Sequence, residues 1–391
     1  MNICVVGLRG IPRVLGGVET HCEHLFPLLK KRRPNDSFTV IARKEHVPHK
    51  ISEYQGLRIV ALGHAKAKYL ETITSTVYGI LYAGVALKAD LVHVHGIGPA
   101  LTAPLARALG LKVVVTYHSK NYEHRKWNKA ARAGLRMGEL CAMYFANSII
   151  AISPSIAKDL QVRFPTLSGK VRFIPNGADH LIQSASQDGA HEVLARYGLL
   201  GRPFILSVGR LVPEKGFHDL LDAFTAADPD YILVIAGGTT QRDVYSERLL
   251  QRAGEKVVFT GFISGCELQV LLRHASLFVL PSHNEGLPIA ALEAAVAGAP
   301  LLLSDIAANR ELGFRPGNYF RVGDVKELGR RLGGEYCDLR VDRERLLQRY
   351  NWNAVCAETD EVYSSLLKTA APNVWDKALT RAKQLFGGHR Q

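Results

Sequence analysis

Short apolar segments alternate with helix-like segments along most of the chain. In the first half, the apolar runs are rich in β-branched residues and lie at Ile3–Val6, Phe38–Ile41, Leu57–Leu62, Leu91–Val94, Val113–Thr116, Ile149–Ile152 and Val171–Ile174. Most of the segments between them have helical spacing or a composition that favours helices. Continuous apolar strands separated by helices are typical of a parallel sheet covered on both faces. We therefore predict an α/β domain for this half.

The pattern breaks once and then restarts. Ile174-Pro-Asn-Gly177 is a turn-forming segment, and the polar stretch Gln183–Gly189 follows it, so we place a domain boundary there. Five more strands are predicted, at Phe204–Val208, Ile232–Ala236, Val257–Thr260, Leu277–Leu280 and Leu301–Ser304. We predict two doubly wound, Rossmann-like domains, at 1–175 and 176–365. A helical tail is predicted at 366–391, for which we consider packing on the first domain.

Composition narrows the class of protein. The 391 residues exceed what one hydrophobic core usually supports. The N-terminal segment MNICVVGLRG lacks the charged start and long apolar run of a signal peptide, and we expect it to form the first strand. No apolar run reaches the roughly 20 residues of a membrane span. The six cysteines form no CxxC pair, so neither a disulfide framework nor a zinc site is expected. These features favour a cytoplasmic protein.

The net charge of +13 is unevenly distributed. Residues 1–175 hold 25 Lys and Arg against 10 Asp and Glu, whereas residues 176–391 hold 24 against 26. A basic half attracts phosphate-bearing partners such as anionic lipid, a pyrophosphate-linked acceptor or nucleic acid, although a merely solvated basic surface is the alternative. Lys120–Arg136 holds six of these cations, and we expect much of it to be a basic amphipathic helix on an anionic membrane. Lys30–Arg33 is a second basic cluster in the same half.

The strongest candidate site is the segment Pro281–Glu293, where a predicted strand ends, a polar loop follows and a helix begins with Pro288 in its first turn. Gly286 permits close backbone approach, and the N–H groups around Leu287 can accept a diphosphate. Glu293 can accept hydrogen bonds from ribose hydroxyls, and Glu285 can reach the hydroxyls of a sugar. The alternative is a capped helix with one buried carboxylate. Because a buried, unpaired Glu293 is costly, we expect it to have a partner.

A second candidate site, Ser207–Gly216, also follows a predicted strand. Arg210 can hold phosphate with two donors, and Lys215 supplies a compact positive charge. Together they can neutralise a leaving diphosphate without a metal ion. An ordinary charged surface loop is the alternative.

Weaker signals lie in the first half. Gly16-Gly17 joins the first strand to a helix and is either part of a phosphate or acceptor cradle or a tight turn. His118 ends a predicted strand and points to the carboxyl edge of the sheet, although a core histidine is the alternative. His93 and His95 share one face of a strand without an evident third metal ligand, so we expect them to be packed or to line an acceptor site.

The segments SVGRLVPEKG and NEGLPIAALEA, with an E-x7-E spacing in the second, resemble the large retaining glycosyltransferase family 4. This resemblance covers nearly the whole chain and implies the GT-B fold, in which two Rossmann-like doubly wound domains face one another across a cleft. Further matching pieces are Gly16–Glu19, Thr116–His118, Ile174–Gly177, Val258–Phe262 and Trp352.

The resemblance implies roles for individual residues. Arg210 and Lys215 would bind the donor diphosphate, Glu293 the ribose and Glu285 the sugar, while His118 would be an active-site histidine near the reacting sugar. Many relatives have Asp after this histidine, where Ser119 stands here. The remaining donor-binding candidates are Gly16, Gly17, Gly261, Phe262, Ile263, Asn284, Gly286 and Leu287, with Gly261–Ile263 and Gly237–Gly238 lining the base pocket. The resemblance also implies retention at the anomeric carbon. The nucleotide-sugar would be the co-substrate, and neither a cofactor nor a metal ion is expected.

The opening segment Gly7–Pro12 resembles enzymes that build bacterial exopolysaccharide or other surface glycans. We therefore expect a lipid-linked glycan acceptor and peripheral contact with the inner face of the plasma membrane. The rivals are a GT-B enzyme with a soluble acceptor and a nucleotide-sugar-binding regulator without transferase activity. No nucleic-acid partner is expected, because the donor motifs are intact. A dinucleotide oxidoreductase is disfavoured, because Gly7-Leu-Arg-Gly10 lacks the G-x-G-x-x-G spacing.

Overall fold

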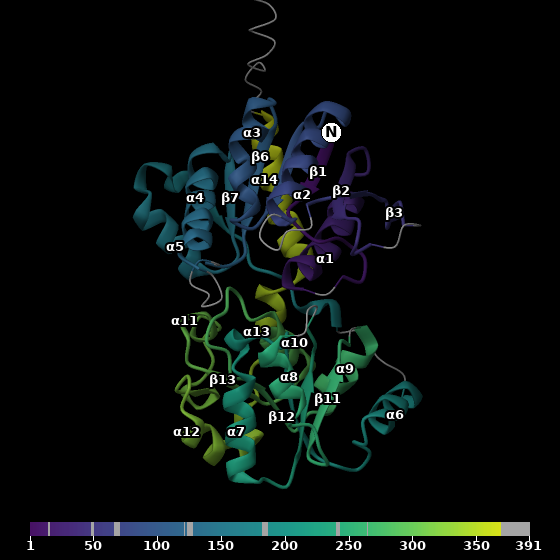
Figure 1. Ribbon diagram of the computed structural model, residues 1–391, viewed down its shortest axis with the longest axis vertical. Helices are drawn as coiled ribbons and strands as arrows, with labels where there is room; N and C mark the ends of the chain where they lie inside the picture. Colours follow the sequence, from purple (N-terminus) through teal and green to yellow (C-terminus); the bar gives the residue numbers. More distant parts are fainter. Residues whose placement is uncertain are drawn as a thin grey trace, which may run out of the picture. The chain divides into compact units, whose positions relative to one another are not determined.

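The chain folds into two α/β units, each built on one sheet (Figure 1). A computed structural model describes residues 1–14, 16–47, 51–65, 71–120, 122, 128–181, 187–239, 243–263 and 265–368. Unit 1 contains residues 1–152, 156–174 and the C-terminal segment from 355, and unit 2 contains 153–155 and 175–354. None of the described helices is both long and apolar enough to cross a bilayer.

The sheet of unit 1 has the strand order β3-β4-β2-β1-β5-β6-β7-β8. Its strands are β1 (Asn2–Val6), β2 (Ser37–Arg43), β3 (Glu53–Tyr54), β4 (Leu57–Leu62), β5 (Leu91–His95), β6 (Lys112–Tyr117), β7 (Ser148–Ala151) and β8 (Val171–Phe173). All neighbours are parallel except β3, which pairs antiparallel with β4. The chain order reverses between β1 and β5, which defines a switch point where such sheets usually bind ligands.

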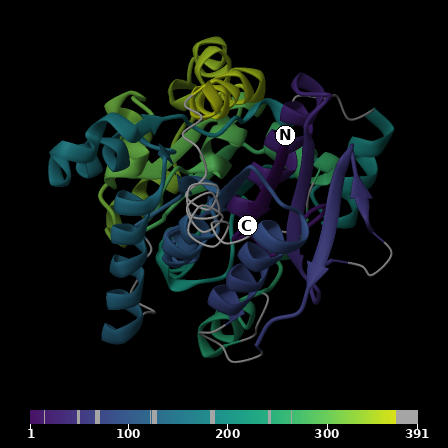
Figure 2. The ribbon, with the colours of Figure 1, turned by 90° about the horizontal axis from the view of Figure 1, so that it is seen from above.

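Helices cover both faces of this sheet (Figure 2). They are α1 (Gly17–Arg32), α2 (Glu71–Leu81), α3 (Ala103–Ala108), α4 (Lys129–Phe145), α5 (Pro154–Arg163) and α14 (Trp352–Lys368). Alternation along β5 separates the faces. Val92 and Val94 join the apolar core with residues of α2, α3, α4 and α5, whereas His93 faces Phe26 of α1 and Tyr363 of α14.

Unit 2 has a six-stranded parallel sheet in the order β11-β10-β9-β12-β13-β14. Its strands are β9 (Phe204–Val208), β10 (Ile232–Ala236), β11 (Val257–Gly261), β12 (Leu277–Leu280), β13 (Leu301–Ser304) and β14 (Tyr319–Phe320). This is the Rossmann order, with its switch point between β9 and β12. The predicted fold of two doubly wound, Rossmann-like domains is therefore present.

One apolar core of unit 2 lies between the sheet and two helices, α7 (Phe217–Ala227) and α12 (Val325–Leu332). Phe217, Leu221 and Phe224 of α7 and Leu328 and Leu332 of α12 pack with alternate residues of the strands. The other helices are α6 (Gln187–Arg196), α8 (Val244–Leu250), α9 (Gly265–His274), α10 (Ile289–Ala297), α11 (Ala307–Arg310) and α13 (Arg343–Arg349).

The C-terminal segment differs from the predicted domain limits. Residues 355–365, which the sequence analysis assigned to the second domain, group with unit 1. Contacts of α14 give the physical reason, because Asp360 forms ion pairs with Arg32 and Arg33 of α1 and the hydroxyl of Tyr363 hydrogen-bonds Nδ1 of His93 at 2.6 Å. The predicted tail at 366–391 lies outside the described residues beyond residue 368.

The structure describes part of the predicted basic segments. Residues 121 and 123–127 lie outside the described residues, and α4 begins at Lys129, with Asn128 as its N-cap. In the second cluster, Arg33 pairs with Asp36 and Asp360, and Nζ of Lys30 donates to two backbone carbonyls. Much of the charge at Lys30–Arg33 is therefore engaged within unit 1.

Candidate active site

Two loops of unit 2 meet at the carboxyl edge of its sheet, one after β9 and one after β12. Nζ of Lys215 lies 2.5 Å from Oε1 of Glu285, and the buried hydroxyl of Ser282 donates to the same oxygen at 2.7 Å. The strands β9 and β12 are neighbours at the switch point. The two candidate segments that the sequence analysis treated separately are thus joined by an ion pair.

Gly216 allows this close approach. Its φ of +67° lies in the left-handed region, and a Cβ atom there would overlap the carbonyl oxygen of Pro281. A backbone hydrogen bond of 2.8 Å from His283 N–H to the Glu214 carbonyl also ties the two loops. The side chain of Lys215 passes over Gly209, where a Cβ would lie 3.4 Å from its Cδ. The position of the Lys215 charge is therefore set by the backbone of both loops.

Several hydrogen-bond donors near this pair are available to a ligand. Arg210 is exposed and has no ion-pair partner among the described residues. The backbone N–H groups of Gly286 and Leu287 also have no acceptor among the residues that the structure describes. The helix α10 begins at Ile289, with Pro288 as its N-cap, so the predicted position of Pro288 in the first turn is wrong by one residue. Asn284 is half-buried in the same loop.

Glu293, on α10, has a partner. It is 7% exposed, and its Oε1 lies 3.1 Å from Nε2 of His180. The indole N–H of Trp352 donates to Nδ1 of the same histidine at 3.2 Å. Because an indole nitrogen can only donate, Nδ1 carries the lone pair and the ring hydrogen is on Nε2. His180 therefore donates a hydrogen bond to Glu293. This is the partner expected for Glu293, because a buried carboxylate without a hydrogen-bond donor is unfavourable.

Sequence reasoning missed His180, although its surroundings carried a signal. The backbone N–H of Trp352 donates to Oδ1 of Asp179 at 2.8 Å, and a Cβ at Gly177 would lie 2.6 Å from the indole ring. The motif ending at Gly177 and the late Trp352 were both recognised, and the structure brings them together. His180 follows that motif by three residues.

The residues expected around the base also meet in unit 2. The ring of Phe262 lies over Gly238, where a Cβ would be about 3 Å from it, and the N–H of Gly237 donates to the carbonyl of Gly261 at 2.9 Å. Phe262 is 43% exposed. Its ring face is therefore held in place by the chain while part of it remains accessible.

His118, in unit 1, follows β6 and belongs to a group of close histidines. Its Nε2 hydrogen-bonds Nδ1 of His95 at 3.1 Å, and His95 stacks on His93 with ring centroids 4.3 Å apart. Burial lowers the pKa of all three side chains well below the ordinary histidine value, and neighbouring imidazoles lower it further. They are therefore neutral at pH 7. His93 and His95 are packed in the unit, as one of the two expectations had it.

Gly16 is the N-cap of α1, which begins at Gly17. The space that a side chain of Gly16 would take is filled by Arg9 and Glu19, whose Nε and Oε1 atoms are 3.0 Å apart. The backbone N–H of Arg9 donates to the same carboxylate at 3.1 Å. The glycine thus lets a largely buried ion pair cross the start of the helix.

Comparisons with known proteins agree with this architecture. The family model described as "Glycosyltransferase Family 4" matches residues 15–180, and that described as "Glycosyl transferases group 1" matches residues 195–316. A glycogen synthase of Mycobacterium tuberculosis is 27% identical, over 93% of this chain and 94% of the relative. An alpha-maltose-1-phosphate synthase of Mycolicibacterium smegmatis is 26% identical, over 93% and 99%.

Solved structures give the same class of fold. A sucrose-phosphate synthase from Thermosynechococcus elongatus has a TM-score of 0.76 at 20% identity, over 94% of this chain and 100% of that one. Anabaena Alr3699/HepE, in complex with UDP and glucose, has a TM-score of 0.75 at 19% identity, over 93% and 100%. These neighbours are GT-B glycosyltransferases, so the predicted fold class is confirmed.

The two sheets and the family matches in both halves define an enzyme of the glycosyltransferase class. The chain belongs to the group 1 and family 4 glycosyltransferases, as its motifs predicted.

Proposed function

We propose that the chain transfers a sugar from a nucleoside diphosphate-sugar held in unit 2. The observation that carries this proposal is the Lys215–Glu285 pair, which lies in the same pair of loops as Arg210. These loops also hold the N–H groups of Gly286 and Leu287, which have no acceptor among the residues that the structure describes. A diphosphate would replace the carboxylate as the partner of Lys215 and would free Glu285 for a sugar hydroxyl. The named activities of the relatives, and the UDP and glucose of one structural neighbour, support a donor of this kind.

The rest of the donor has candidate contacts in the same unit. Glu293 would accept from the ribose hydroxyls, since His180 occupies one of its carboxylate oxygens and leaves the other available. The accessible ring of Phe262, beside Gly238 and Gly261–Ile263, would pack against the base.

For the reaction, we propose retention at the anomeric carbon. The bond from C1 to the diphosphate oxygen breaks, the acceptor oxygen attacks C1 from the same face, and its proton passes to the departing phosphate. Arg210, Lys215 and the N–H groups of the loop after β12 would stabilise the charge that develops on the leaving group without a metal ion. His118 is a neutral imidazole in unit 1, the unit that we propose to bind the acceptor. Proton NMR of the first-formed product tests this scheme, and an inverted anomeric configuration would reject it.

Thermal stabilisation tests the donor site. We would titrate the protein with UDP-, GDP-, dTDP- and ADP-sugars and measure the unfolding transition. Binding at 100 times the dissociation constant should stabilise it by about 2.7 kcal/mol. Lys215→Ala and Glu293→Ala should lose this shift, whereas Lys256→Ala, which removes a lysine paired with Asp228 in the same unit, should keep it. No shift with any donor would reject the proposed nucleotide-sugar site in unit 2 and favour another ligand.

For the acceptor, we propose a lipid-linked glycan reached from an anionic membrane through α4. Four large apolar side chains of this helix are exposed, namely Met137, Leu140, Tyr144 and Phe145. Met137, Leu140 and Tyr144 follow helical spacing and so share one face. Exposed Lys129 and Arg136 on the same helix, and the positive charge of this half, suit an anionic lipid surface.

Vesicle flotation tests this contact. The protein should float with vesicles of phosphatidylglycerol and phosphatidylcholine but not with phosphatidylcholine alone. Leu140→Ser with Tyr144→Ser should reduce flotation severalfold, because both remove apolar surface without changing charge. The control Val244→Ser, at an exposed apolar residue of unit 2, should behave as wild type. Flotation that is absent or unchanged by the paired substitution would favour a soluble acceptor, such as the glucans that the relatives' names imply.

A further inference from the structure

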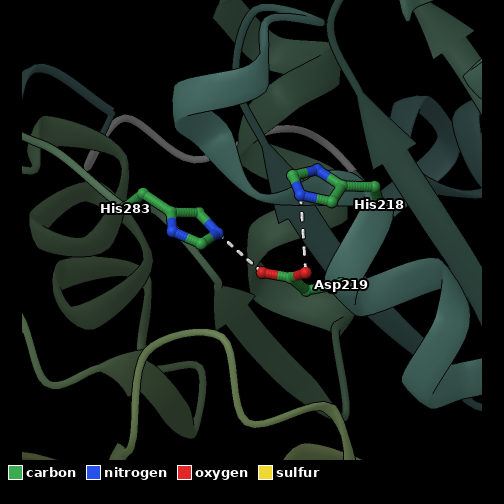
Figure 3. A group of neighbouring side chains, drawn as sticks. All are labelled: His218, Asp219 and His283. Atoms are coloured by element: carbon green, nitrogen blue, oxygen red, sulfur yellow. Dashed lines mark hydrogen bonds and ion pairs between the residues drawn. The ribbon is translucent and has the colours of Figure 1, made fainter. Parts of the chain in front are cut away.

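A second group of polar side chains lies outside the proposed donor contacts. His218 and Asp219 are in the first turn of α7, and His283 is in the loop after β12. Nε2 of His283 lies 2.6 Å from Oδ2 of Asp219, and Nε2 of His218 lies 3.4 Å from Oδ1. Figure 3 shows both imidazole rings directed at the carboxylate, one toward each oxygen. One ligand atom from each residue lies within 4.8 Å of the other two.

The backbone holds these side chains together. The hydrogen bond from His283 to Glu214 fixes the loop after β12 against the segment that precedes α7. Gly216, two residues before His218, leaves no room for a side chain between the loops, and a Cβ there would also lie 3.2 Å from Cδ2 of His283. The three groups are therefore brought together by the packing of the loops and need no ligand to assemble them.

The spacing suits a tetrahedral metal ion. Metal–ligand bonds of about 2.0–2.1 Å place neighbouring tetrahedral ligands roughly 3.3 Å apart. Nε2 of His218 lies 3.4 Å from Oδ1 of Asp219, which matches this value, whereas Nε2 of His283 lies 2.6 Å from the other oxygen, Oδ2. Small side-chain rotations must therefore bring both nitrogens and one carboxylate oxygen to this spacing. The imidazole planes of the two histidines differ by only 6°.

A hydrogen bond with Tyr245, which lies outside the group of three, orients the imidazole of His218. The hydroxyl of Tyr245, on α8, lies 3.0 Å from Nδ1 of His218. With the hydrogen on Nδ1, this contact leaves the lone pair of Nε2 directed at the carboxylate, which is the usual arrangement for a metal-binding histidine. The carboxylate of Asp219 supplies the oxygen ligand between the two imidazoles.

We propose that His218, Asp219 and His283 form a binding site for a divalent d-block cation such as Zn²⁺. A water molecule would be the fourth ligand. Two imidazoles and one carboxylate suit Zn²⁺ and Co²⁺, whereas Ca²⁺ and Mg²⁺ prefer oxygen ligands throughout. On binding, the hydrogen that His283 now directs at Asp219 moves to its Nδ1. The bound ion ties α7 to the loop that carries Glu285, so it would stiffen one wall of the proposed donor site.

This site shares no side chain with the proposed donor contacts, so its test is independent of theirs. We would titrate the protein, without any histidine tag, with Co²⁺ and follow the visible absorption of the ion. One Co²⁺ per chain with the intense absorption of tetrahedral coordination is expected, and Zn²⁺ should displace it. His283→Gln and His218→Gln should each weaken binding at least tenfold, while His191→Gln, at an exposed histidine of α6, should leave it unchanged.

A second measurement guards against a variant that misfolds. In wild type and His191→Gln, Zn²⁺ should raise the midpoint of thermal unfolding, and in His283→Gln it should not. His283 is exposed, so its replacement should preserve the fold. No Co²⁺ or Zn²⁺ binding by the wild-type protein, or binding that survives both histidine substitutions, would overturn the proposal.

Discussion

At the scale of single residues, the most informative contact is the one between His180 and Glu293. The carboxylate is buried on an otherwise apolar helix, and its hydrogen-bond donor comes from the start of unit 2. His180 is in turn held by Trp352. It is a positioning residue, because its ring is directed at Glu293 and Glu293 is the group proposed to touch the donor.

Replacing His180 should affect both stability and donor affinity. His180→Phe removes the donor of a buried carboxylate and should reduce the free energy of unfolding by about 1–3 kcal/mol. His180→Gln keeps an N–H donor and should restore most of this loss. In steady-state kinetics, the phenylalanine variant should raise KM for the donor sugar more than it lowers kcat, because the proposed ribose contact is made before the transition state. If His180→Phe and His180→Gln had the same stability and the same kinetics, His180 would not position Glu293.

The sequence predicted most of the polar residues at the carboxyl edge of unit 2 but not how they are paired. Lys215 and Glu285 were both selected, yet their ion pair depends on Gly216 and Pro281 coming into contact across 65 residues of chain. His180 was missed, because neither a periodic pattern nor a charge pair marks it and its one signal was the motif that ends three residues earlier, at Gly177. Such pairings are set by tertiary packing.

At the scale of elements, the junction between β9 and α7 is the most constrained. Gly216 combines a left-handed φ with a close approach to Pro281, and both the Lys215–Glu285 pair and the proposed metal site depend on that approach.

Gly216→Ala should therefore be more destabilising than its backbone conformation explains. Gly201 has almost the same φ, +66°, and no heavy atom of the described residues lies within 4 Å of a Cβ placed there. Gly201→Ala should cost about 1–2 kcal/mol for the left-handed conformation, and Gly216→Ala should add a further 1–3 kcal/mol or so for the overlap. Urea unfolding measures both, and equal losses would contradict the proposed role of the contact.

The sequence predicted the strands more accurately than it predicted which unit the last helix belongs to. Each of the twelve predicted strands is present, because strands covered on both faces are continuous apolar runs. The strands β3 and β14 were missed, since two residues are too few to show a pattern. Residues 355–365 were assigned to the wrong unit, because the partner of Tyr363 lies 270 residues earlier in the chain.

At the scale of the whole molecule, the neutral histidines His93, His95 and His118 of unit 1 tie its stability to pH. Their pKa values are lowered in the folded state, so below pH 6.5 or so the unfolded chain binds protons that the folded chain does not. The stability that they contribute is fully present above the unfolded-state pKa and is lost as the pH falls below it.

Unit 1 should therefore lose stability between pH 7 and pH 5. Each histidine that stays neutral contributes roughly 1 kcal/mol per pH unit below its unfolded-state pKa. Hydrogen exchange followed by mass spectrometry separates the units, and peptides of β5 and β6 should lose protection in this range before those of β9 and β12. Equal responses of the two sheets would contradict this assignment.

The hydrogen bond from Trp352 to His180 has a consequence for optical spectroscopy. The chain has three tryptophans, at positions 127, 352 and 375. In a Trp127→Phe, Trp375→Phe variant, all indole fluorescence would arise from a ring that is one hydrogen bond from His180 and two from Glu293. A nucleotide-sugar that draws Glu293 away from His180 would change the electron density on Nδ1 and shift the emission of this single ring. The molecule thus contains its own fluorescent reporter of donor binding.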